Sequence, residues 1–103
     1  MTEAMQSQHL GRLLALTDAM LSGARSQSWD EVIDTQKQRG ALLGEFFSDD
    51  LSLDKDKLAE AIRQIITADK EIMALGGVHK DGLKRQLKNI TQGKSAIKAY
   101  TSA

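Results

Sequence analysis

The feature that most constrains this chain is a stripe of apolar residues that repeats with a helical period through its second half. Intervals of three and four residues keep the stripe in register across Asp69, Gly76, His79 and Lys94. Only a helical period brings residues at such intervals to a common side. The members of the stripe are Leu58, Ile62, Ile65, Ile72, Leu83, Leu87, Ile90 and Ile97. A continuous helix from residue 53 to residue 100 would be roughly 70 Å long at ~1.5 Å per residue.

The glycine pair Gly76-Gly77 is the main objection to a single long helix, because each glycine costs about 1 kcal/mol relative to alanine in a helix interior. However, the stripe re-enters at Leu83 in the phase that it left at Ile72, and neither a capping serine nor a proline follows the pair. We therefore predict an all-α fold: an antiparallel bundle of three helices with a long C-terminal helix, bent at the glycines. A break at the pair, which gives four helices, is the alternative.

Two shorter helices are predicted before the long one. The first covers residues 3–24, and the second opens at a capping box, Ser28-Trp29-Asp30-Glu31, and fades near residue 48. Ser52 is predicted to cap the third helix, with Asp54 in its first turn. At the same rise per residue the first two helices span roughly 33 and 28 Å. They would cover mainly one half of the third helix, and the uncovered apolar half would be an association surface.

Composition limits the class of protein. The 103 residues fit a single domain, residues 1–103, and the absence of cysteine excludes disulfides and thiolate metal sites. Fourteen basic residues balance fourteen acidic ones, which argues against a general binder of nucleic acids or membrane surfaces. Neither a signal peptide nor an apolar run of about 18 residues is present. We expect a soluble cytoplasmic protein without membrane insertion.

The candidate chemical motifs do not complete a site. A calcium loop counted from Asp50 would place Lys55 where glycine is required and Ala61 where glutamate is required. His9 and His79 lack a second ligand at helical spacing. We therefore predict no enzyme, no metal and no cofactor.

Two charge features leave alternatives open. Asp69 lies on the apolar stripe, where it either pairs with a basic group of the first or second helix, with Arg12 as one candidate, or lies at the edge of the face. The segment from Lys80 onward contains six positive charges and one negative charge, a net charge of +5. This segment is either a solvated helix face or a surface for an acidic partner or nucleic acid.

Two groups of residues, taken in their order and spacing, resemble a known family. The first group is Trp29, Gln38-Arg39, Leu42-Leu43 and Phe46-Phe47. The second group is Ile65-Ile66-Thr67-Ala68-Asp69-Lys70-Glu71-Ile72, Leu87-Lys88-Asn89-Ile90 and Gly93-Lys94-Ser95-Ala96-Ile97-Lys98-Ala99-Tyr100. Together they resemble the FliT-like family of flagellar type III export chaperones, which escort the filament-cap protein.

The resemblance implies a small all-helical cytoplasmic chaperone that holds an aggregation-prone flagellar subunit and delivers it to the export apparatus. Combined with the apolar stripe, it predicts a set of residues that bind the partner: Phe46, Phe47, Leu83, Leu87, Ile90, Ile97 and Tyr100. Family members often carry a further C-terminal helix that shields the binding surface, whereas only three residues follow Tyr100 here. A homodimer is the other way to shield it.

Two other function classes compete with the chaperone. One is a structural helical protein that dimerises through the same stripe. The other is a small regulator that contacts nucleic acid through the basic C-terminal segment. Tyr100 is the only aromatic residue of that segment, so base stacking has little support there.

Overall fold

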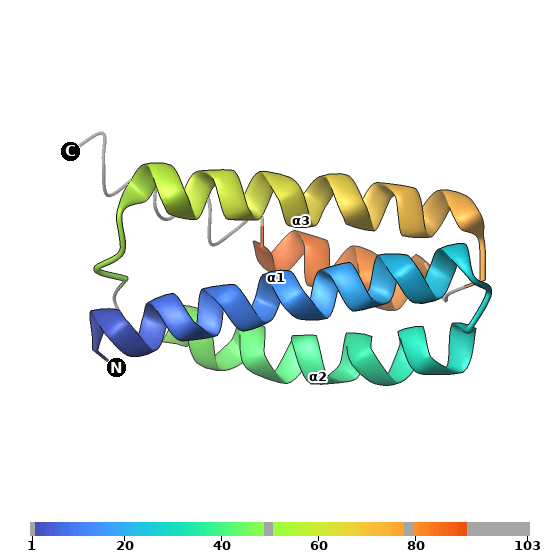
Figure 1. Cartoon of the computed structure of the whole chain (residues 1–103), viewed down its shortest axis with the longest axis horizontal. Coiled ribbons are helices and arrows are strands. Elements are labelled where there is room, and N and C mark those ends of the chain that lie inside the picture. The colour runs from blue at the N-terminus through green and yellow to red at the C-terminus, as the bar shows by residue number, and fades with distance from the viewer. Residues whose placement is uncertain (1, 49–50, 78–79, 91–103) are drawn as a thin grey trace.

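A computed structural model describes residues 2–48, 51–77 and 80–90, and these residues are helical apart from short connections (Figure 1). Three long helices come first: α1 (Glu3–Arg25), α2 (Trp29–Ser48) and α3 (Lys55–Leu75). Residues 80–90 form a fourth, shorter helix. None of the described ranges contains a strand. The predicted all-α class is confirmed.

The prediction of one continuous C-terminal helix is wrong, and the four-helix alternative is what the chain adopts. Helix α3 ends at Leu75, and Gly76 follows it with φ +85° while its N–H donates to the Met73 carbonyl at 3.2 Å. That left-handed conformation is cheap for glycine and costly for other residues. Gly77 lies directly against the indole ring of Trp29, where a Cβ atom would overlap the ring. The glycine pair therefore ends the helix instead of bending it.

The four helices lie alongside one another. Helix α1 packs against both α2 and α3. Figure 1 shows the chain reversing along the long axis after α1 and again after α2, with the helix of residues 80–90 (orange) behind α1. The fold-back at the glycines places the stripe residues Leu83, Leu87 and Ile90 against the apolar clusters of the same molecule.

Helix ends are fixed by side chains near the connections. Thr2 caps α1, accepting a bond from the Met5 amide at 3.2 Å. The cap of α3 is Asp54, which accepts from the Asp56 amide at 2.8 Å, so the prediction that Ser52 caps this helix is wrong. Ser52 instead donates its amide and hydroxyl to Oε1 of Gln6, at 2.9 and 3.1 Å. These bonds tie the α2–α3 connection to the start of α1.

The core consists of two apolar clusters. The first contains Leu13, Leu42, Leu43, Phe46, Leu58, Ile62, Ile65 and Ile90, and the second contains Met20, Ala24, Val32, Ile72 and Leu83. A buried or half-buried polar residue separates the two clusters in every helix. These residues are Thr17 in α1, Arg39 in α2, Asp69 in α3 and Gln86 in the fourth helix. A polar layer therefore crosses the core between the clusters.

Candidate functional site

The seven residues predicted to bind a partner fall into three groups in the structure. Phe46, Leu83 and Ile90 are fully buried, each with a relative exposure of 0%. Phe47 and Leu87 are half-buried and pack against the first cluster. The remaining two, Ile97 and Tyr100, lie outside the described residues.

The prediction that the second half of the apolar stripe is uncovered is therefore wrong for its residues up to Ile90. The turn at the glycines lets this segment fold back, so Leu83 enters the second cluster and Ile90 enters the first. The periodicity correctly gave the buried side of the segment, but the molecule itself supplies the cover. A partner contact by any of the seven residues stays a prediction.

An ion pair between Arg39 and Asp69 forms the centre of the polar layer. Both guanidinium NH2 groups donate to the carboxylate, Nη1 to Oδ1 and Nη2 to Oδ2, each at 2.7 Å. Both side chains are fully buried. Of the two alternatives left open for Asp69, the structure shows the ion pair with a basic group of the first or second helix. The partner is Arg39 of α2, whereas Arg12, the candidate named from the sequence, is exposed.

Thr17 and Gln86 complete the layer. Arg39 Nη1 also donates to Thr17 Oγ1 at 3.2 Å, while Nε and Nη2 both donate to Gln86 Oε1, at 3.1 and 3.0 Å. Gln86 in turn donates its own amide to the Gln36 carbonyl at 2.8 Å. An arginine side chain has five N–H donors, and these bonds use all of them.

The electrostatics of this layer are those of a closed structural pair. Burial raises the pKa of the Asp69 carboxyl, and the hydrogen bond and positive charge of Arg39 act in the opposite direction. Two buried charges are tolerated only when they are paired and hydrogen-bonded. Among the described residues, no buried side-chain nitrogen or oxygen lacks a partner. The layer therefore specifies how the four helices align.

Arg39 was missed as a core residue, although the sequence holds a signal for it. It lies seven residues after Val32 and four before Leu43, both buried in α2, so it falls on the apolar face of that helix. An arginine in phase with core positions, together with an aspartate in phase with another helix's core, is the pattern of a buried pair.

The helix of residues 80–90 approaches α2 closely. A Cβ atom on Gly40 would lie 2.9 Å from Nε2 of Gln86, and one on Gly82 would lie 3.1 Å from Nε2 of Gln36. Glycine at these two positions therefore leaves room for the glutamine side chain that reaches across from the facing helix. We call the apolar and polar surface beneath this helix the covered surface; it is formed by Arg39 and by the residues of α1, α2 and α3 in the two clusters.

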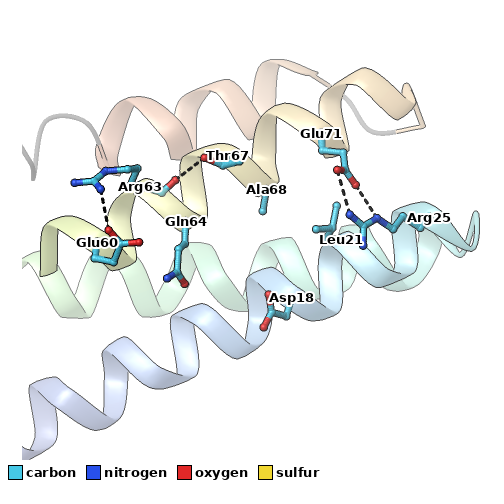
Figure 2. A pocket seen from close by; sticks show the side chains of 9 residues that line it. All are labelled: Asp18, Leu21, Arg25, Glu60, Arg63, Gln64, Thr67, Ala68 and Glu71. Carbon is cyan, nitrogen blue, oxygen red and sulfur yellow. Dashed lines mark hydrogen bonds and ion pairs between the residues drawn. The ribbon is translucent and has the colours of Figure 1, made fainter. Parts of the chain in front are cut away.

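A second feature is an open groove between α1 and α3 (Figure 2). Its charged side chains include two ion pairs, Arg25 with Glu71 at 2.7 Å and Arg63 with Glu60 at 2.8 Å. The hydrogen bond from Arg25 and its positive charge hold the pKa of Glu71 below its usual value. Exposed pairs of this kind contribute little to stability, and the groove offers no nucleophile with an adjacent base.

The described residues contain neither a metal-binding cluster nor a membrane-spanning helix. Within them, no group of three or more histidine, aspartate or glutamate side chains could hold a metal ion. No helix in the part of the chain described is both long and apolar enough to cross a membrane.

Comparison with known proteins gives one match. The family model described as flagellar protein FliT matches residues 7–102 of the chain. No curated protein and no solved structure matches it. The matched span includes most of α1, the whole of α2, α3 and the helix of residues 80–90, and the polar layer.

Proposed function

The chain belongs to the family of the flagellar protein FliT, a flagellar export chaperone family, and we propose that it binds the filament-cap protein in the cytoplasm before export. The family match over residues 7–102 is the observation that carries this proposal. The client is an aggregation-prone subunit whose helical segment needs an apolar surface until it reaches the export apparatus. Binding of this kind requires no catalytic step and no cofactor.

The covered surface is the docking site in this proposal. A client helix can use it only when the helix of residues 80–90 moves away, because this helix fills it in the free chain. We call the helix of residues 80–90 the cover. Two fully buried apolar side chains, Leu83 and Ile90, anchor it. Phe46 and Phe47 belong to the surface beneath. The predicted contacts at Ile97 and Tyr100 remain part of the proposal.

The energetics favour a cover that opens. In this helix two large aliphatic side chains are fully buried, whereas α1 and α3 each bury five or six residues. Elements with few buried contacts open at a lower free-energy cost than the rest of a molecule. The glycines before the segment let it leave without disturbing α3.

Titration calorimetry with a C-terminal peptide of a filament-cap protein tests the proposal. Replacing both anchors, Leu83→Ala with Ile90→Ala, weakens the cover and leaves the surface beneath intact. We expect the peptide to bind this variant at least tenfold more tightly than the wild type, since tenfold is about 1.4 kcal/mol. Leu75→Ala is the matched control, because Leu75 is 47% exposed and lies outside both clusters.

Other results would contradict specific parts of the proposal. Weaker binding by the double variant would mean that the client docks on Leu83 and Ile90 themselves. Equal binding by Phe47→Ala and the wild type would remove Phe47 from the docking surface. A peptide that binds neither wild type nor double variant would be the wrong client.

A further inference from the structure

We infer that Arg39 selects the helix that docks on the covered surface, by requiring a glutamine side chain between two apolar anchors. This inference rests on the proposed function and names the chemistry of the partner at the same site. It starts from the hydrogen bonds that Arg39 donates to Gln86 of the helix now covering the surface.

The hydrogen bonds of Arg39 divide between the long helices and the docked helix. Three of its five N–H groups bond to Thr17 and Asp69, which belong to α1 and α3. The other two, on Nε and Nη2, bond only to Oε1 of Gln86. When the helix of residues 80–90 leaves, these two donors lose their acceptor, and Asp69 still holds the guanidinium in place.

The docked helix therefore needs an acceptor at one defined position. Gln86 follows Leu83 by three residues and precedes Ile90 by four, so all three lie on one face of the helix. A partner with the same order presents an apolar residue, a glutamine three residues later and a second apolar residue four residues after that. An apolar residue in the middle position would leave two N–H groups of a buried, permanently charged arginine unpaired.

Glutamine fits this position better than glutamate. The Gln86 side chain accepts from Arg39 and also donates to the Gln36 carbonyl at 2.8 Å. A carboxylate can accept from Arg39 but cannot donate, so it would bring a negative charge against that carbonyl oxygen. It would also add a second negative charge to a layer in which Asp69 already balances Arg39. The expected order of binding is glutamine, then glutamate, then leucine.

Fluorescence anisotropy with the full chain and a labelled peptide of residues 80–90 tests this order. The chain carries Leu83→Ala and Ile90→Ala, so that its own helix competes weakly. We expect the Gln86→Leu peptide to bind at least tenfold more weakly than the native peptide, although leucine is the better helix former. The control peptide, Lys84→Leu, changes an exposed position and should bind within about twofold of the native peptide, since its change lies outside the layer.

Two results separate this inference from the proposed function. If the native and Gln86→Leu peptides bind equally, Arg39 does not select the docked helix by its glutamine, and the inference fails. That result does not contradict the proposal that the client docks through apolar contacts. If no peptide binds, the covered surface does not accept helices in trans, which overturns both.

A second measurement uses the otherwise native chain, so it does not depend on the alanine variant folding. In urea unfolding, Gln86→Leu should lower the midpoint in the wild-type background. The same change should have no such effect when Arg39→Met and Asp69→Leu are also present. An equal lowering in both backgrounds would mean that Gln86 acts independently of Arg39, which contradicts the inference.

Discussion

At the scale of single residues, Arg39 and Asp69 tolerate joint replacement better than the loss of either one. Arg39→Met alone leaves the buried Asp69 carboxylate without the two hydrogen bonds from Arg39, and such a loss costs about 3–5 kcal/mol. The pair Arg39→Met with Asp69→Leu removes both charges, so we expect a smaller loss than for either single variant. Urea unfolding followed by circular dichroism measures all three free energies.

Double-mutant analysis of those values gives the coupling between the two side chains. Thr35→Ala is a suitable control, because the Thr35 hydroxyl bonds only to the carbonyl of Glu31 in its own helix. Losses for Arg39 and Asp69 that simply add would contradict a coupled buried pair.

Replacement by alanine should change the stability in opposite directions at Gly77 and Gly11. At Gly77 a Cβ atom would overlap the Trp29 indole, so Gly77→Ala must move that ring and lower the melting temperature. At Gly11, inside α1, a Cβ atom would meet nothing within 4 Å. Gly11→Ala should therefore stabilise the protein by up to about 1 kcal/mol, the difference in helix propensity.

Tryptophan fluorescence distinguishes the cause of these changes. Trp29 is the only tryptophan in the chain, so Gly77→Ala should shift its emission, whereas Gly11→Ala should not. An unchanged emission and melting temperature for Gly77→Ala would contradict the close contact between Gly77 and the indole.

From the sequence it was easier to identify residues with a structural role than to predict which of these residues contact one another. The position of Asp69 on an apolar stripe raised an ion pair as one of two alternatives, beside a carboxylate at the edge of the face. Its partner was not predictable, because pairing depends on how two helices align along their axes, and periodicity within each helix does not fix that alignment. The same limit applies to Ser52, whose bonds to Gln6 join segments far apart in the sequence.

At the scale of helices, the segment of residues 80–90 should be the first to open. It is shorter than α1, α2 and α3, and its fully buried side chains are Leu83 and Ile90. Elements with few buried contacts exchange their amides through local opening, without global unfolding. We expect amides of this helix to exchange faster than those of the α1 and α3 interiors in native-state hydrogen exchange.

The anchor variant provides the control for this expectation. Leu83→Ala with Ile90→Ala should accelerate exchange in residues 80–90 further and leave the interior of α3 unchanged. Equal exchange rates across all four helices would mean that the protein opens as one unit, which contradicts a separable cover.

The long stripe shows why the helices were partly predictable. The buried side of the stripe follows from a helical period, and the ends of α1 and α2 lie within one residue of the predicted bounds. The break at Gly76 was not favoured, because the stripe keeps its phase from Ile72 to Leu83. Phase reports which side of a segment is buried. Phase does not show whether the helix axis continues or reverses. The backbone conformation at the glycines decides that.

At the scale of the whole molecule, charge is divided between the cover and the rest of the chain. Residues 80–90 carry four positive charges and one negative charge, a net +3, and the residues before Lys80 carry −5. Attraction between these parts favours the closed arrangement and is screened by salt. We expect hydrogen exchange in residues 80–90 to accelerate between low salt and about 1 M salt, where the Debye length is about 3 Å. Exchange that is insensitive to salt would contradict an electrostatic contribution to closure.

Because the described part of the chain buries most of its large apolar side chains within one molecule, the structure also predicts the oligomeric state. Among the described residues, the large apolar side chains that are exposed are Met5 and Leu75, at 48% and 47%, and they lie on different helices. A stable homodimer buries about 800 Å² on each partner, and two separate side chains do not form a patch of that size. We expect sedimentation velocity to give a monomer at micromolar concentration for the wild type.

Opening the cover should reverse that result. In Leu83→Asp, a carboxylate replaces a fully buried anchor, and burying it unpaired is so costly that the helix leaves the core. The exposed covered surface should then cause concentration-dependent self-association, while Lys84→Asp, which changes an exposed neighbour, should stay monomeric. A wild-type dimer as tight as the Leu83→Asp association would favour the structural dimerisation protein over the chaperone, because the apolar surface would then be used between copies of the chain before any client arrives.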